Sequence, residues 1–464
     1  MSFSTRNILR VQFSTIAILI AIAWTAGTVN NYKMYRGGGR WGIFQADMFA
    51  YYAYLPAYFV YDGDFEFKFT EQIPENSHHI FLPVKAPKTG KTVNKVTCGP
   101  AMLMSPFYII ADKYIEYIGY DFDGKRDGFS RPYRVAVMYG LIFYELIALF
   151  LLRNVLRKQF DDYTVGFTLL AILLGTNLFY YSVHEGVMTH GYSFCLFCAF
   201  IFLTDCWYSS KKWTDLLLLG ALTGMIFLVR PTNLLIGVFF LLYNIHKLED
   251  FKERALLFFN KKGQFLMALI AAFIVISPQL WLWKKNSGDW LFFSYDTRFE
   301  RFYWTEPAIL GGLFSYCKGW FVYTPLMFIA FFGLISMKNR VKAWFWPLAV
   351  FSILNIYVVL SWWSWWYGGG FGLRAFAEAG APMSFALASL IDWAKTKALL
   401  IKIAIPTLVG CCIVLNLFQT RQYHEGFIRW TGMTKERYWG VFGKYYLTPE
   451  EHKIYDDMYE EPSR

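Results

Sequence analysis

Charged residues are scarce in this sequence, and so are the motifs of most soluble enzymes. Only 17% of the 464 residues are charged, whereas 56% are hydrophobic and 21% are aromatic. A chain this apolar does not fit an ordinary soluble domain. The sequence contains no GxxxxGK(S/T), no HExxH and no GxSxG, which removes the usual signatures of P-loop nucleotide-binding proteins, zinc proteases and α/β-hydrolases.

Cysteine is sparse as well, with seven residues scattered along the chain. Cys195 and Cys198 lie one helical turn apart inside an apolar stretch, where cysteine serves packing, so we interpret them as neither a redox nor a zinc motif. Cys98 and Cys317 fall in polar loops and could pair, although nothing in the sequence requires a disulfide.

Apolar stretches long enough to cross a membrane recur to the end of the chain, and they predict an all-α polytopic membrane protein with about eleven transmembrane helices. The predicted spans are residues 11–29, 133–152, 165–183, 188–207, 216–229, 233–245, 265–283, 320–337, 343–361, 376–393 and 399–418. The first span has no convincing cleavage site, so we expect it to be retained. The short fifth and sixth spans could also form one kinked helix.

The distribution of basic residues predicts how the chain is oriented in the membrane. If the N-terminus is inside, each short inside segment is basic, as the positive-inside rule requires. The residues are Arg6, Arg10, Arg153, Arg157, Lys158, Lys211, Lys212, Lys247, Lys252, Arg254, Lys261, Lys262, Lys338, Arg340, Lys342, Lys395 and Lys397. The C-terminus is then outside, and the net charge of +11 reflects topology and not nucleic-acid binding. The outside segments include a long first loop, residues 30–132, and a short charged tail, residues 419–464.

The first outside loop combines an isolated acid with aromatic residues. Asp47 lies within residues 41–62, among Tyr51, Tyr52 and other rings. Aromatic rings suit flat lipid and sugar faces, and an isolated carboxylate suits a general base. The alternative is that Asp47 only caps an interfacial helix over residues 48–59. Further along the loop, residues 100–118 carry charges that argue against a span, so we expect a helix lying along the membrane surface.

A second acid stands at the corner between the third and fourth spans, in the segment YSVHEGVMTH. Glu185 could orient an acceptor or assist Asp47, while His184 and His190 could hydrogen-bond a hydroxyl or a phosphate. The two histidines could also hold a divalent metal ion together with Glu185, but the spacing matches no standard set of metal ligands, so no cofactor is predicted from the motifs. The alternative is a capped helix start with interfacial histidines.

Three basic residues are candidates for binding a phosphate. Arg230, followed by Asn233 in LVRPTN, would cost roughly 2.5–3.5 kcal/mol in the membrane interior, so it needs a partner such as a phosphate. Snorkelling, or an ion pair with Glu185 or Asp47, would also satisfy it. Lys318 stands just before the eighth span, and Arg374 follows the glycines of WWSWWYGGGFGLR. Glycines let backbone N–H groups approach a ligand closely.

Taken in order, these segments resemble the GT-C superfamily of polytopic glycosyltransferases. The similarity is to bacterial relatives of the dolichyl-phosphate-mannose protein mannosyltransferases and of the lipid A aminoarabinose transferases. It rests on FQADMFAYYAYLPAYF, NKVTCGPAMLMSPFYIIA, HEGVMTHGYSF, LVRPTN, SYCKGWFVYTPL and WWYGGGFGLRAF, and it covers residues 11–418. The resemblance implies a GT-C-like bundle, a polyprenyl-phosphate-sugar donor and a catalytic base in the first outside loop, which corresponds to Asp47. Asp47 has no second acid beside it, unlike the metal-dependent members that transfer oligosaccharides.

The sequence thus predicts a glycosyltransferase that works at the outer face of the cytoplasmic membrane. Asp47, assisted by Glu185, would act on the acceptor. The residues expected to bind substrate are Tyr51, Tyr52, His184, His190, Arg230, Asn233, Lys318 and Arg374. Two other classes stay open. A transporter would also bury charges between helices, but it favours matching halves that are not found here. A non-catalytic lipid-carrier-binding assembly protein would keep the arginines and would not need Asp47.

Overall fold

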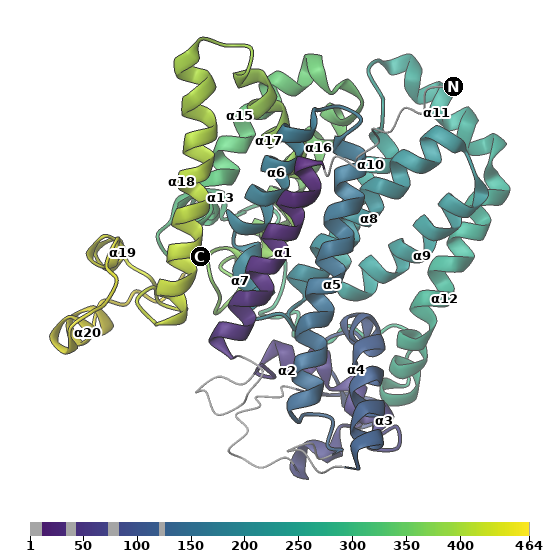
Figure 1. Cartoon of the computed structure of the whole chain (residues 1–464). Helices are drawn as coiled ribbons and strands as arrows, with labels where there is room; N and C mark the ends of the chain where they lie inside the picture. The colour runs from purple at the N-terminus through teal and green to yellow at the C-terminus, as the bar shows by residue number, and fades with distance from the viewer. Residues whose placement is uncertain (1–11, 34–42, 73–82, 120–125, 464) are drawn as a thin grey trace, which may run out of the picture.

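The computed structural model describes residues 12–33, 43–72, 83–119 and 126–463, so Arg6, Arg10 and Trp41 lie outside the described residues. The all-α fold class is confirmed (Figure 1). The bundle comprises α1 (Phe13–Tyr32), α5 (Arg131–Leu156), α6 (Asp162–Leu174), α7 (Leu178–Val183), α8 (Thr189–Ser210), α9 (Trp213–Val229), η4 (Pro231–Ile236), α10 (Gly237–Leu242), α11 (Leu248–Asn260), α12 (Lys262–Ser287), α13 (Ile309–Phe314), α14 (Trp320–Tyr323), α15 (Pro325–Arg340), α16 (Lys342–Ser361), η5 (Arg374–Ala379), α17 (Gly380–Ala394) and α18 (Leu399–His424).

Among the described residues, six helices are long and apolar enough to cross a membrane: α1, α5, α8, α12, α16 and α18. Each of the other predicted spans is also helical, but its helix is shorter or broken into pieces. The number of spans, about eleven, therefore stays a prediction. The fifth and sixth spans are separate segments, because Arg230 between α9 and η4 adopts an extended conformation.

The third predicted span breaks at residues 175–177, between α6 and α7. A broken helix leaves backbone carbonyls that cannot find water inside a membrane, so other groups must satisfy them. The amide of Asn416 in α18 supplies two hydrogen bonds, to the carbonyls of Leu174 and Thr176, both at 2.8 Å. The break is thus held by the bundle itself. It places Asn177 beside the glycine-rich segment before Arg374.

The first outer loop is partly helical, as expected, with α2 (Asp47–Tyr52), α3 (Tyr54–Phe59), η2 (Lys68–Gln72), the antiparallel pair β1 (Val84–Lys85) and β2 (Thr92–Val93), and α4 (Gly99–Ile118). The α4 helix packs against the first half of α5, where the hydroxyl of Tyr144 donates to the carbonyl of Leu103 at 2.9 Å. The orientation of α4 along a membrane surface stays a prediction.

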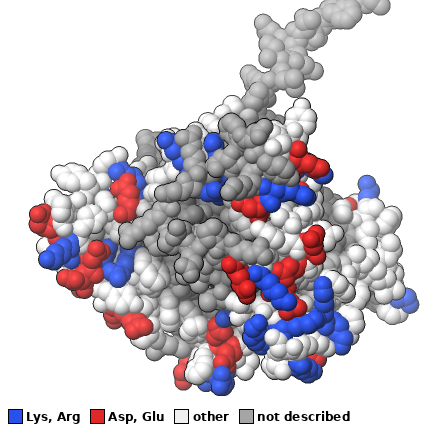
Figure 2. Space-filling view, turned by 90° about the horizontal axis from the view of Figure 1, so that it is seen from below, with Lys and Arg blue, Asp and Glu red and all other residues white. Residues whose placement is uncertain are grey.

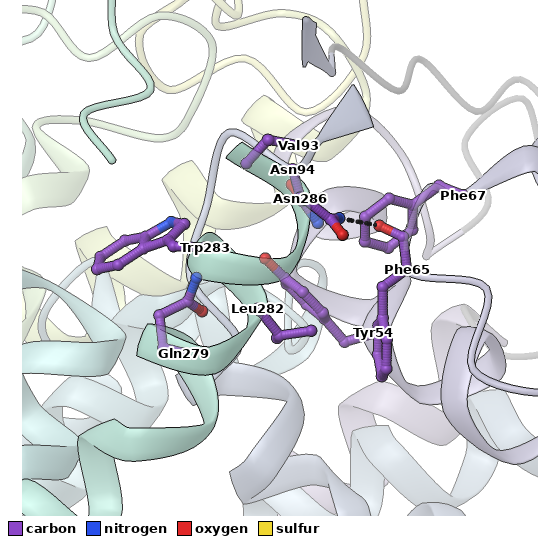
Figure 3. A pocket seen from close by; sticks show the side chains of 9 residues that line it. All are labelled: Tyr54, Phe65, Phe67, Val93, Asn94, Gln279, Leu282, Trp283 and Asn286. Carbon is purple, nitrogen blue, oxygen red and sulfur yellow. Dashed lines mark hydrogen bonds between the residues drawn. The ribbon is translucent and has the colours of Figure 1, made fainter. Parts of the chain in front are cut away.

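The loop is fastened to the end of α12 around a small pocket (Figure 3). Asn286 of α12 donates to the carbonyls of Phe65, at 2.7 Å, and Thr92, at 3.1 Å. Asn94 then donates to the carbonyl of Ala50 in α2 at 2.8 Å. The pocket is lined by aromatic, aliphatic and amide side chains without a charged group. Asn286 and Asn94 thus link the end of α12 to the loop, and the loop to α2, the helix that begins with Asp47.

The first outer loop and the end of α18 lie at the same end of the bundle (Figure 1). Three rings from helix ends far apart in sequence meet there, with centroids 4.3–4.6 Å apart: Tyr32 at the end of α1, His184 just after α7 and His424 at the end of α18. Beyond α18 the tail forms α19 (Lys435–Val441) and α20 (Pro449–Asp456). Seen from this end, acidic and basic side chains both appear among uncharged surface (Figure 2).

Candidate active site

Asp47 begins α2 and does not cap it. The N-cap position is Ala46, and no side chain caps the helix. The Asp47 carboxylate instead accepts a hydrogen bond from the guanidinium of Arg374 at 2.9 Å. The helix-cap alternative is therefore wrong. The side chain of Asp47 is 48% exposed, so an acceptor hydroxyl can reach it without unfolding the loop.

The backbone before Asp47 is strained. Ala46 has φ 46° and ψ −124°, a combination that a residue with a Cβ avoids. Such strain persists only where the surrounding structure enforces it, and it often accompanies a functional side chain. Here it sets the direction in which α2 starts, and so the direction of the Asp47 carboxylate.

Arg374 follows a glycine loop, residues 366–373, whose backbone passes close to its neighbours. Gly370 has φ 153°, and a Cβ there would lie 2.6 Å from the hydroxyl of Tyr181 and 3.5 Å from Cδ of Arg374. Asn177 holds the loop through its amide, which donates to the carbonyls of Phe371 and Leu373 at 3.4 and 3.3 Å. The loop thus forms a wall against which the Arg374 side chain packs.

Glu185 lies near this ion pair. The hydroxyl of Tyr180 donates to its carboxylate at 3.0 Å. Burial raises the pKa of Glu185, although the positive charges of Arg374 and Lys318 oppose that rise. Burial acts against the charge of Arg374, yet the negative charges of Asp47 and Glu185 help to raise its pKa above the ordinary value. The arginine therefore stays charged with an acid on either side.

A second charged cluster lies deeper. Glu378 of η5 accepts from Arg230 at 3.1 Å, and its other oxygen lies 3.2 Å from Nδ1 of His190. Its side chain is 2% exposed. The guanidinium of Arg230 also lies over the ring of Tyr367, 5.1 Å from its centroid. Neither Glu185 nor Asp47 forms this ion pair; the partner of Arg230 is Glu378.

Tyr51 connects the two clusters. Burial raises the pKa of its hydroxyl, and so does the charge of Asp47, while both Arg374 and Arg230 lower it. Asp47, Arg374, Arg230 and Glu185 are therefore electrostatically coupled within one region, and their role as an active site stays a prediction. Tyr295, from the loop between α12 and α13, is electrostatically coupled to the same charges.

Other predicted residues lie elsewhere or have other partners. Tyr52 is fully buried and its hydroxyl donates to the carbonyl of Gly128, so its prediction as a substrate contact finds no support. Asn233 donates to the hydroxyl of Ser193 at 2.9 Å. His184 is stacked between Tyr180 and His424, and within the described residues its ring nitrogens have no hydrogen-bond partner.

Lys318 is 1% exposed. Its amine donates to the backbone carbonyls of Gly370 and, at 2.7 Å, Trp430. Burial lowers the pKa of Lys318 to about 7. Its donors are thus directed at the protein and not at an open site.

Sequence reasoning missed Glu378. The signal was present, because Glu378 is an acid inside the predicted span 376–393, and a charge inside a span needs a partner. Cys98 and Cys317 are both free thiols. In the described part of the chain, no group of three or more His, Cys, Asp or Glu side chains is arranged to hold a metal ion.

No protein-family model matches the chain, and no curated protein matches it significantly. Among solved structures it is similar to the oligosaccharyltransferase AglB from Archaeoglobus fulgidus. The form in complex with an inhibitory peptide and a dolichol-phosphate is 13% identical, with a TM-score of 0.49. The apo form is 14% identical, with the same TM-score. Each alignment covers 96% of this chain and 60% of the archaeal chain. At this level the similarity identifies neither an activity nor a substrate.

Proposed function

We propose that this chain is a membrane glycosyltransferase that moves a sugar from a polyprenyl-phosphate carrier to an acceptor on the outer face of the cytoplasmic membrane. The observation that carries the proposal is the ion pair between Asp47, in the first outer loop, and Arg374, at the end of the glycine loop. It joins a half-exposed carboxylate to a partly buried arginine, and a second arginine, Arg230, is electrostatically coupled to the first. A base and phosphate ligands are the two elements that such a transfer needs.

In the proposed reaction, Asp47 takes the proton of the acceptor hydroxyl. The hydroxyl oxygen forms a bond to the anomeric carbon as the bond from that carbon to the phosphate oxygen breaks. The polyprenyl phosphate leaves with the bonding electrons, and its new charge is stabilised by Arg374 and Arg230. A single displacement inverts the anomeric centre. Glu185 and Tyr51 line the region between the acceptor and the donor.

The ion pair also implies an order of binding. While Arg374 donates to the Asp47 carboxylate, the guanidinium competes with an acceptor hydroxyl for the same oxygen. The carrier phosphate presents two oxygens in the geometry that arginine binds best, so it competes with Asp47 for Arg374. Binding of the donor thereby frees the base for the acceptor.

The transporter alternative is less favoured because a transporter of this size typically shows two matching halves with interrupted helices, and the sequence shows no internal repeat. The assembly-protein alternative keeps Arg374 and Arg230 but gives Asp47 no chemical task. The substitution that separates an enzyme from a binding protein is therefore at Asp47. The proposed orientation, with the N-terminus inside and the C-terminus outside, follows from the basic loops.

The test is Asp47→Asn in the full-length protein, purified in lipid nanodiscs. We expect sugar transfer from a polyprenyl-phosphate-sugar donor to a membrane extract to fall by about 10²–10⁴-fold, because asparagine cannot accept the proton. Binding of polyprenyl phosphate should persist or tighten, since Arg374 loses a competing partner. Asp296→Asn, which alters a similarly exposed acid paired with Arg298 in the loop between α12 and α13, is the matched control. If Asp47→Asn transfers sugar at the wild-type rate, the proposed catalytic role is wrong and a non-catalytic, lipid-carrier-binding assembly protein is favoured.

A further inference from the structure

The tail after α18, residues 425–463, is built around one buried arginine. Arg437 is 2% exposed. Its guanidinium donates to the carbonyls of Phe427 at 3.1 Å, Gly426 at 3.0 Å and Tyr455, and it pairs with Asp456 at 3.2 Å. Because these acceptors come from the first residues of the tail and from residues near its end, the guanidinium holds the two ends of the tail together. The tail is therefore a small folded module and not a loose extension.

This tail module packs on the candidate active site. One hydrophobic cluster contains Phe371 of the glycine loop and Tyr181 together with buried residues of the tail. The tail residues in it are Phe427, Ile428, Met433, Tyr438, Val441 and Leu447. The ring of Trp430 lies against Gly369, where a Cβ would be 2.8 Å from Cε3. The tail and the glycine loop thus share one core.

Hydrogen bonds join the same two segments. The backbone N–H of Gly370 donates to the carbonyl of Trp430 at 3.2 Å. The buried amine of Lys318 donates to both the Gly370 and the Trp430 carbonyls. At the other end of the tail, the indole of Trp365, just before the glycine loop, donates to the carbonyl of Ser463 at 3.0 Å. Lys318 is the side chain that bonds to both segments at once.

We propose that the tail module is a clamp on the glycine loop, and that Lys318 is the positioning residue that couples the clamp to Arg374. The coupling passes through Gly370, whose backbone backs the Arg374 side chain. With the clamp in place, Arg374 points at Asp47 and at the region proposed for the carrier phosphate. The assignment rests on the proposed function only for the identity of the ligand, because the clamp itself is defined by contacts within the chain.

The experiment compares full-length wild type with Lys318→Met and Arg437→Ala in nanodiscs. Lys318→Met keeps a long side chain and removes the hydrogen bonds at the loop, whereas Arg437→Ala loosens the tail without touching the loop. Lys435→Ala is the matched control, since Lys435 is an exposed basic residue of α19. The first readout is the rate at which phenylglyoxal modifies Arg374, followed by mass spectrometry. The second is the affinity for polyprenyl phosphate.

Both test variants should expose Arg374, so phenylglyoxal should modify it about tenfold faster. The affinity for polyprenyl phosphate should fall by about tenfold or more, because buried hydrogen bonds that position Arg374 are lost. In an Arg374→Ala background, Lys318→Met should add no further loss of affinity, since the coupled residue is already gone. A residue with a general structural role would give additive losses instead.

The clamp is overturned if Arg374 is modified at the wild-type rate in both variants, or if carrier affinity survives faster modification. Failure of the proposed function looks different. In that case wild type binds no polyprenyl phosphate and transfers no sugar, while modification of Arg374 still responds to the two variants. Chymotrypsin cleavage at the exposed Tyr445 and Tyr446 shows whether Arg437→Ala has released the tail alone.

Discussion

The two charged clusters at the candidate site contain the same kinds of side chain but differ in depth. Asp47 and Arg374 form a pair whose acid is 48% exposed, whereas the acid between Arg230 and His190, Glu378, is 2% exposed. A pair open to solvent holds its partners weakly and can exchange them. A buried acid that loses its partners becomes costly. Under the proposed function, we therefore expect the outer pair to exchange with substrate and the inner cluster to support Arg230.

The largest expected effect is a loss of stability when Glu378 of the inner cluster is replaced. Glu378→Ala should lower the stability of the bundle by about 3–5 kcal/mol, because it leaves Arg230 without its buried counter-charge. Thermal unfolding in nanodiscs measures the change, with Glu425→Ala, at the partly exposed end of α18, as the control. A variant that unfolds at the wild-type temperature would show that the inner cluster does not support the fold.

The outer pair should show the opposite pattern. Arg374→Ala should weaken binding of polyprenyl phosphate by about tenfold to a hundredfold, with little change in stability, because a charged hydrogen bond to the phosphate is lost while Asp47 stays hydrated. Arg374→Lys should restore only part of the affinity, since lysine lacks the fork of donors.

Binding isotherms for both Arg374 variants and for Arg230→Lys would sharpen this point. If Arg230→Lys shows the loss of affinity expected here for Arg374→Ala, while Arg374→Ala itself binds normally, the inner cluster holds the phosphate and the assignment of the two clusters is reversed.

The loop behind the outer pair should respond to pH through Lys318. Its pKa of about 7 in the folded protein lies below the ordinary value of 10.5. Between these values the unfolded chain binds more protons, so the contribution of Lys318 to stability rises with pH there and levels off on either side. Wild type should therefore gain stability relative to Lys318→Met between about pH 7 and about pH 10. Thermal unfolding across this range tests it, and a difference that is constant with pH contradicts it.

The smallest expected effect concerns the start of α2. Ala46→Gly relieves the strained backbone, so stability should rise by about 1 kcal/mol. Sugar transfer should fall a few-fold, because Asp47 is then less firmly directed. Ala53→Gly, at the end of α2 in an ordinary helical conformation, should lower stability instead and serves as the control. Unchanged transfer by Ala46→Gly would mean that the strain has no part in directing Asp47.

The sequence predicts the helical bundle well because long apolar runs respond to the membrane and not to distant partners. It also predicts that Asp47, Glu185, Arg230 and Arg374 share one end, since the basic loops define the two sides. The sequence does not predict which side chains form ion pairs. Asp47 and Arg374 are 327 positions apart, and no local pattern encodes which arginine meets which acid.

Tyr52 and Lys318 show the same limit at the level of single side chains. Tyr51 and Tyr52 are adjacent on α2 and chemically identical, yet the helix turns one toward Arg374 and Arg230 and the other into the core. From the sequence alone, Lys318 is predicted to bind phosphate. In the structure its amine donates to backbone carbonyls of the glycine loop and the tail, and a sequence does not reveal such acceptors.

The helices that lead into the site are short. With 13, 17 and 15 residues, α6, α9 and α17 extend about 20–26 Å, less than the roughly 30 Å of a hydrocarbon core. The helices α5, α12 and α18, each of 26 residues, extend about 39 Å. The bundle therefore combines helices that are longer than the hydrocarbon core is thick with shorter helices. The short helices have ends near Asn177, Arg230 and Glu378. Under the proposed function, helix ends of this kind would bring the two arginines closer to the depth of a headgroup phosphate, so that the carrier would bind without lifting its chain out of the bilayer.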